Sequence, residues 1–311
     1  MILLPIVYFS YQTIERANAN KPEGYKWPSL SDYKLMIVTT LLFMIIENSA
    51  DYFFTPMFEK VCREQVDLEV RKVRSKKAIK NIYKGFYFIG TTTFAYMVLK
   101  GSYIMPPLLG GDDSFYDHFT HYPYWEHPKY YTEFYMTCMG YNMAGLLQEL
   151  FFEDKGRNDY LEMLLHHVIT VYLVVFGYAT NIFMGAPVIL VHNASDALIC
   201  FVRTINESKY YAKNPIIFFP ALFIWVYMRC ITFPQLLYAV IFYTNHVYMP
   251  PLLMPLFRLC LCCLQCLHFY WTFLLFKIIY NFFFKGVADD LINKNKISSA
   301  EVSATVLKKQ L

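Results

Sequence analysis

Charged side chains are scarce in this sequence. Asp, Glu, Lys and Arg together make up 17% of the 311 residues, whereas soluble globular domains carry about 25%. The apolar share is 56% and the aromatic share is 19%, more apolar surface than so few charges can cover in water. The composition therefore excludes a disordered chain and a secreted disulfide scaffold. It indicates a protein with several membrane-spanning segments.

The sequence also lacks the features of a nucleic-acid-binding module. Its 28 Lys and Arg exceed its 24 Asp and Glu by four charges, too small an excess for a surface that binds a polyanion. Neither a glycine-rich phosphate loop nor an internal repeat is present. Function is therefore expected inside the apolar segments, with no nucleic-acid partner.

Seven windows are long and apolar enough to cross a bilayer, which takes about 20 residues of helix. These windows are 33–54, 81–101, 130–152, 160–181, 184–204, 215–243 and 249–284. Because lipid offers no partner to an open strand edge, they are predicted to be helices. The expected fold is an all-α polytopic membrane protein with about seven transmembrane helices. The apolar start, MILLPIVYFSYQ, is too short to span and is expected to lie at the membrane interface.

Lysine and arginine are distributed unevenly between the loops. Three loops are rich in them: 55–80, 153–159 and 205–214. The alternate connections contain neither residue: 102–128, 182–183 and 244–248. Because basic loops remain in the cytoplasm, the first set is predicted to be cytoplasmic, together with the tail from Lys285. The second set is predicted to lie on the far side with the N-terminus.

The chain ends in Lys308-Lys309-Gln310-Leu311. This ending resembles the dilysine signal that returns membrane proteins to the endoplasmic reticulum. The endoplasmic reticulum membrane is therefore the expected location, with another organelle membrane as the alternative.

Ionisable side chains inside membrane segments are costly and usually mark function. Two neighbouring windows carry His166, His167, His192 and Asp196. At 1.5 Å per residue, His167 lies about 12 Å below the cytoplasmic end of its helix, and Asp196 lies about 12 Å below the end of the next one. Since the two helices are antiparallel, these polar groups share one depth. The pattern predicts one site that opens to the cytoplasm.

Histidine suits catalysis because it transfers protons and attacks electrophiles near neutral pH. His192 and Asp196 are four residues apart on one helix face, so the carboxylate is expected to orient the imidazole as in a catalytic triad. His166 and His167 point about 100° apart, which predicts that one faces the reactant and the other supports it.

Two other interpretations of the same residues are open. The histidines and Asp196 could only tie helices together, or they could bind zinc or iron. Adjacent histidines on a helix diverge too much to chelate one ion easily, so no metal is expected.

The stretch 163–196 resembles the Lag motif of the TLC-domain family, and specifically that of ceramide synthases. The matching residues are His166, His167, Thr170, Tyr178, Asn181, Gly185, His192, Ser195 and Asp196. Two later segments are also similar: WVYMRCITFP, which contains Arg229 and Pro234, and LQCLHFYWTFLLFKII, which contains His268 and Trp271. The resemblance divides the chain into an N-terminal segment with the first span (1–70), a TLC domain (71–285) and a cytoplasmic tail (286–311).

This resemblance implies a barrel of six helices in which an acyl group passes from acyl-coenzyme A to the amine of a sphingoid base. Acyl-coenzyme A is then a substrate, and no cofactor is expected. The catalytic residues implied are His166, His167, His192 and Asp196. The substrate-binding residues implied are Asn193, Tyr178, Asn181, Arg229, His268 and Trp271. The partners are these substrates or another membrane lipid, and a homodimer or a membrane complex is left open.

The sequence departs from the family pattern at two positions. In His192-Asn193-Ala194-Ser195-Asp196, the aspartate that follows the histidine in the family motif is replaced by Asn193, and Cys200 stands where synthases usually have an acidic residue. Two carboxylates are thus missing where amine and imidazolium charges need stabilising. The alternative function is therefore a catalytically inactive TLC protein that binds or senses lipid, or a structural subunit of a membrane complex.

Overall fold

A computed structural model of the protein describes residues 3–102, 105–111, 119–153, 155–156, 159–244 and 253–285. Apart from an isolated bridge between Cys62 and Ser208, the regular structure in these ranges is helical. The prediction of an all-α protein is confirmed. The tail 286–311, with its dilysine ending, lies outside the described residues.

All the main helices except the first fall on the predicted windows. They are α1 (Leu3–Ala19), α2 (Tyr33–Glu59), α3 (Leu68–Leu99), α4 (Tyr131–Phe151), α5 (Tyr160–Ala179), α6 (Gly185–Glu207), α7 (Asn214–Val226), α8 (Phe233–Phe242) and α9 (Leu253–Lys285). The π-helix η4 (Tyr227–Thr232) joins α7 to α8, and short 3-10 turns lie at η1 (Pro107–Leu109) and η3 (Tyr211–Lys213).

Five helical stretches are long and apolar enough to cross a membrane: α2, α5, α6, Tyr211–Phe242 and Leu253–Asn281. The chain is therefore a multi-pass membrane protein. Helices α3 and α4 cover the other two predicted windows with 32 and 21 residues. Because α3 begins with a strongly basic stretch, its composition is less apolar, and the count of seven spans stays a prediction.

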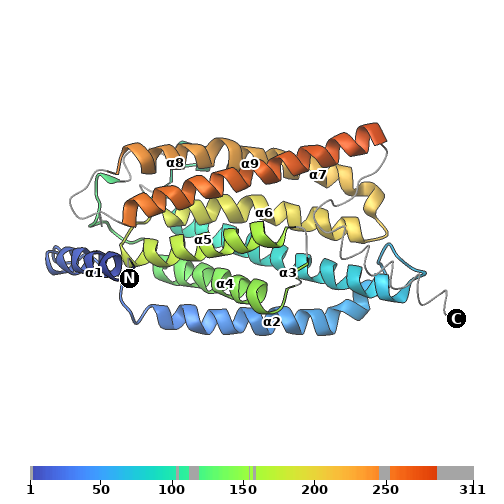
Figure 1. Cartoon of the computed structure of the whole chain (residues 1–311), viewed down its shortest axis with the longest axis horizontal. Coiled ribbons are helices and arrows are strands. Elements are labelled where there is room, and N and C mark those ends of the chain that lie inside the picture. Colours follow the sequence, from blue (N-terminus) through green and yellow to red (C-terminus); the bar gives the residue numbers. More distant parts are fainter. Residues whose placement is uncertain are drawn as a thin grey trace.

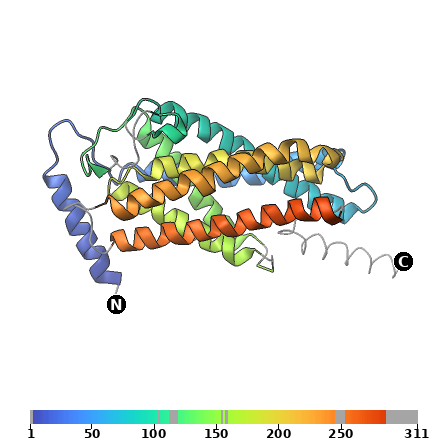
Figure 2. The ribbon, with the colours of Figure 1, turned by 90° about the horizontal axis from the view of Figure 1, so that it is seen from above.

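Helices α2 to α9 run along the long axis of the molecule, with α2 at one edge and α7, α8 and α9 at the other (Figure 1). Helix α1 stands at an angle across one end of this bundle (Figure 2). The opposite end holds the start of α3 and the end of α6, and we call it the basic end. The end near α1 holds residues 119–131 and 180–184, and we call it the far end.

A buried carboxylate fastens the basic end. Helix α3 begins after Asp67, whose side chain accepts the backbone N–H groups of Glu69 and Val70, as an N-cap does. Two to three turns later, Arg74 lies 2.9 Å from Glu207 Oε2, and Lys77 lies 2.8 Å from its Oε1. These ion pairs hold the start of α3 against the end of α6.

Candidate active site

A cavity of about 230 Å³ lies inside the bundle. Its described lining comes from α3, α4, α5, α6, the α7–η4–α8 stretch and α9, and none of it from α2. Six helical stretches thus surround one internal space. This arrangement agrees with the six-helix barrel that the resemblance implies.

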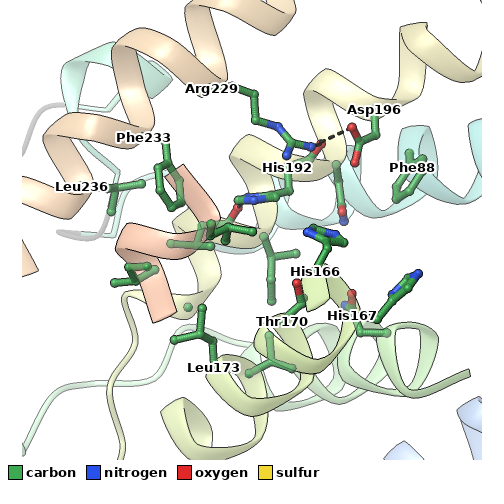
Figure 3. A pocket seen from close by; sticks show the side chains of 18 of the residues that line it. Phe88, His166, His167, Thr170, Leu173, His192, Asp196, Arg229, Phe233 and Leu236 are labelled. Carbon is green, nitrogen blue, oxygen red and sulfur yellow. Dashed lines mark hydrogen bonds and ion pairs between the residues drawn. The ribbon is translucent and has the colours of Figure 1, made fainter. Parts of the chain in front are cut away.

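Seven of the ten predicted site residues line this cavity: His166, His167, His192, Asn193, Asp196, Arg229 and Trp271. Figure 3 shows His166 beside His192, with Asp196 and Phe88 to the right and Leu173, Phe233 and Leu236 to the left. The polar groups therefore gather in the half of the cavity toward the basic end. Their chemical roles stay predictions.

Arg229 is the centre of the polar cluster and is 1% exposed. Its Nε donates to Ser195 Oγ at 2.7 Å, its Nη2 to Asp196 Oδ1 at 2.7 Å, and its Nη1 to His268 Nε2 at 2.8 Å. A buried charge is costly unless it is paired and hydrogen-bonded. These bonds satisfy the guanidinium and fix it in one position.

Pro234 comes just after the π-helix that carries Arg229. The turn has i to i+5 bonds, such as the one from the Phe233 N–H to the Met228 carbonyl. Proline has no N–H, so the carbonyl of Arg229 lacks its partner five residues on. Gln265 of α9 donates to that carbonyl at 3.2 Å. Pro234 thus explains why the wide turn, a feature common at functional sites, contacts α9.

His192 and Asp196 do not form the predicted pair. In the described part of the chain, His192 Nδ1 donates to the Val188 carbonyl at 2.7 Å, and its Nε2 lies 3.0 Å from His268 Nε2. The carboxylate of Asp196 instead accepts from Arg229. A charge-assisted bond to a guanidinium is stronger than one to a neutral imidazole, and this explains the correction.

His166 and His167 both reach the cavity from α5, with ring centroids 5.5 Å apart. The ring of His166 lies 6.4 Å from that of His192 and 5.3 Å from that of Trp271. Its Nδ1 is buried and has no hydrogen-bond partner among the described residues. His167 packs on α4 at Gly145, where an added Cβ would lie 3.0 Å from the imidazole. His166 is thus a histidine with a nitrogen available for chemistry.

Three predicted substrate-binding residues lie outside the cavity wall. Tyr178 donates to Asp32 Oδ2 at 2.8 Å, and Asn181 binds the loop residues 123–127. His268 is fully buried behind His192. These three side chains contact other parts of the protein and do not line the cavity, and their assignment to substrate binding stays a prediction.

The sequence reasoning missed three residues that matter to the site. Lys84 and Arg203 line the cavity near the basic end, and Thr91 accepts from Asn193 Nδ2 at 2.9 Å. Arg203 lies seven residues after Asp196, two helical turns along the same face, so its position was accessible from spacing. Lys84 and Thr91 depend on how α3 packs against α6, which spacing does not reveal.

Among the described residues, no cluster of three or more His, Cys, Asp or Glu side chains is placed to hold a metal ion. The histidines instead contact each other, Arg229 and Trp271. The arrangement can hold and transfer protons, and it can offer an imidazole to an electrophile at the cavity wall.

The fold and the site define a multi-pass helical membrane protein with a partly polar internal cavity. A sequence model of the TLC domain matches residues 77–277, well over half of the chain. The chain therefore belongs to the TLC-domain family. The matched range lies inside the predicted domain 71–285.

Named relatives of the chain are ceramide synthases. The human protein ceramide synthase 4 is 30% identical over 154 residues, which cover 49% of this chain and 39% of the relative. Ceramide synthase hyl-2 of Caenorhabditis elegans is 25% identical over 296 residues, 88% of this chain and 86% of the relative. Ceramide synthase LAG1 of Saccharomyces cerevisiae is 25% identical over 149 residues, which cover 44% of this chain and 36% of the relative. The chain is thus similar to ceramide synthases, although it spans well under half the length of the human and yeast proteins.

Proposed function

We propose that the protein is a ceramide synthase-like N-acyltransferase that moves a fatty acyl group from acyl-coenzyme A to the amine of a sphingoid base. The observation that carries the proposal is the joining of a polar cluster to an apolar chamber in one cavity. His166, His167 and Asp196 stand at the boundary between the two. A thioester held at that boundary can extend its apolar chain away from the water-filled mouth.

The reaction needs a proton acceptor and a place for the acyl carbon. The C–S bond of the thioester breaks, the amine nitrogen forms a C–N bond to the acyl carbon, and one amine proton passes to the coenzyme A thiolate. A histidine can take the proton from the amine and return it to sulfur, or it can carry the acyl group between the two steps. We assign these two roles to His166 and His167.

Asp196 is the group that we assign to the incoming amine. Its Oδ1 is held by Arg229, yet its side chain is 27% exposed. The carboxylate can therefore accept an N–H of the amine through its remaining lone pairs. Arg229 and His268 act as positioning residues for Asp196 and His192.

Two cations at the mouth suit the phosphates of coenzyme A. Lys84 and Arg203 line the cavity toward the basic end, where a soluble substrate would enter from the cytoplasm. Both residue types bind phosphate oxygens well. We therefore place the coenzyme A moiety there, with its acyl chain directed inward.

The second candidate function is a lipid-binding or lipid-sensing protein without turnover. Asn193 favours it, because this amide donates to Thr91 and adds no negative charge beside Asp196. The neighbouring Cys200 is buried and carries no carboxylate either. Such a protein would hold an acyl chain in the same cavity and release it unchanged, alone or as a subunit of a membrane complex.

For the cellular setting we propose the endoplasmic reticulum membrane, with the basic loops and the C-terminal tail in the cytoplasm. Support comes from the distribution of basic residues and the dilysine ending, together with the multi-pass architecture. Protease protection of an epitope on the tail in sealed microsomes tests the orientation.

The deciding experiment is transfer from a labelled long-chain acyl-coenzyme A to sphinganine by the purified full-length protein. His167→Ala, Asp196→Ala and Asn193→Asp are measured beside the wild type, with folding checked by gel filtration. The synthase proposal expects product from the wild type and loss of at least about 100-fold in the first two variants. An inert wild type that gains activity in Asn193→Asp supports a binding protein derived from a synthase. Four inert proteins would overturn the enzyme proposal.

A further inference from the structure

We propose that Phe119 and Met184 form a stop at the far end of the cavity that sets the maximum length of the acyl chain. The inference rests on the proposed acyl transfer. It identifies the residues that determine specificity, which the Lag motif does not name. We call these two side chains the stop.

Beyond Thr170, which follows His166 by one turn of α5, the lining of the cavity is apolar as far as the stop. The lining of this part comes from four helices, α5, α6, α8 and α9. The residues are Leu173, Val174, Gly177, Val188, Ile189, Leu236, Leu237, Val240, Met254, Phe257 and Leu261. An alkyl chain is the ligand that such a lining accommodates, because it offers no hydrogen-bonding partner to a polar group.

The stop itself is buried on its outer side. Phe119 is 6% exposed and Met184 is 3% exposed, and both line the cavity. They belong to one apolar core with Tyr122, Trp125 and Phe183 of the far end. A chain that reaches Phe119 or Met184 therefore meets close-packed side chains instead of water or lipid.

A set of hydrogen bonds holds the two segments of the stop together, and we call this set the latch. Its centre is Asn181, whose φ of +57° is a left-handed conformation that asparagine tolerates. Asn181 Nδ2 donates to the Pro123 carbonyl at 2.7 Å, and His127 Nε2 donates to Asn181 Oδ1 at 2.9 Å. The Trp125 indole also donates to the Asn181 carbonyl at 3.1 Å. The latch thus joins loop 119–131 to the segment that carries Met184.

The latch stays closed at neutral pH. Burial lowers the pKa of His127 to about 4, against the opposing effect of its bond to Asn181. The imidazole is therefore neutral near pH 7, and its single N–H is on Nε2, because the amide oxygen of Asn181 can only accept. The latch also explains why the motif includes Asn181, although this residue does not line the cavity.

The depth of the apolar part fixes a length. His166 and Gly177 lie 11 residues apart on α5, and His192 and Met184 lie eight apart on α6, about 17 and 12 Å along a helix. With C–C bonds of about 1.5 Å, an extended chain advances about 1.3 Å per carbon. The space from the histidines to the stop holds roughly 9 to 13 carbons in this simple geometry. Chains of about this length are expected to react best, and much longer ones are expected to be excluded.

The experiment is a competition among saturated acyl-coenzyme A substrates from C6 to C26, with sphinganine as acceptor and the product lengths measured by mass spectrometry. Met184→Ala and Phe119→Ala should each move the optimum to chains about two to three carbons longer, because they remove about 4 Å of side chain. Val188→Phe, one turn nearer the histidines, should move it to shorter chains. Phe119→Leu is the milder variant if Phe119→Ala does not fold.

Met136→Ala is the matched control, since Met136 is fully buried in the same core but does not line the cavity. It should lower stability and leave the product lengths unchanged. A wild type that transfers no acyl chain contradicts the proposed function. A wild type that is active but keeps its length profile in Met184→Ala, Phe119→Leu and Val188→Phe contradicts the stop alone.

Asn181→Gly tests the latch as a positioning device. Glycine adopts positive φ readily, so the backbone is kept while both side-chain bonds are lost. The expected result is a broader length profile with an unchanged KM for the best acyl-coenzyme A. A uniform loss of rate at every length, with the profile intact, would show that the latch serves stability only.

Discussion

Two buried arginine–carboxylate pairs in this protein are built in opposite ways. In the Arg229–Asp196 pair the arginine is 1% exposed and the carboxylate 27%, whereas in the Arg74–Glu207 pair the arginine is 11% exposed and the carboxylate 1%. The first pair presents its negative charge to the cavity, and the second hides it between two helices. Similar chemistry thus serves a site in one place and a joint in the other, and exposure of the carboxylate distinguishes the two.

Arg229→Leu should have the largest effect, because it leaves Asp196 buried without its partner. Loss of one partner of a buried ion pair costs about 3 to 5 kcal/mol, and acyl transfer should fall below detection. The free energy of unfolding is measured by denaturant titration in detergent micelles. Arg229→Lys is the companion variant, and recovery of full activity in it would contradict the role of the guanidinium fork.

Asp196→Asn should separate activity from stability. The amide keeps the size of the carboxylate and one acceptor for Arg229, so a loss of only about 1 kcal/mol is expected from the weaker bond. Acyl transfer should nevertheless fall about 100-fold or more, because the carboxylate that holds the incoming amine by a hydrogen bond is gone. Steady-state rates and thermal midpoints on one preparation provide both numbers. If the rate and the thermal midpoint both fell only slightly, Asp196 would have a structural role like that of Glu207 in the Arg74–Glu207 pair.

Glu207→Gln should show the reverse pattern. Arg74 and Lys77 lose their counter-charge, but both are partly exposed and can be solvated. We expect a loss of about 2 to 3 kcal/mol of stability and a kcat per folded molecule within about twofold of the wild type. A kcat that falls together with that of Asp196→Asn would show that the basic end takes part in the reaction.

Arg203→Ala should have the smallest effect, since it removes one exposed contact to a phosphate. The KM for acyl-coenzyme A should rise about threefold to tenfold with kcat unchanged, which corresponds to about 1 kcal/mol. The difference from the wild type should shrink at 0.5 M salt because of screening. The matched change at Lys209, outside the cavity lining, should leave KM unaltered.

Much of the fold was predictable because lipid imposes long apolar helices, and all seven windows coincide with helices. The depth of His166, His167 and Asp196 followed from the helical rise, and they do share one cavity. The partner of Asp196 was not predictable, because Arg229 lies 33 residues away and reaches it through a π-turn. That Tyr178 and Asn181 do not line the cavity was not predictable, because a motif records the positions of residues and not where their side chains point.

The π-turn has a consequence for how this segment tolerates changes in length. Each residue of an α-helix turns the chain by about 100°. Deleting one residue between Trp225 and Arg229 would therefore rotate the arginine away from Ser195 and Asp196, or it would move Trp225 away from the guanidinium. In the intact protein Arg229 Cζ lies 4.6 Å from the centroid of the Trp225 ring. Deleting one residue between Arg229 and Pro234 would remove the extra residue of the wide turn and rotate α8 by about 100° relative to the arginine. The number of residues in this stretch is therefore as strict a requirement as their identity, and a one-residue deletion should be harsher than most substitutions there.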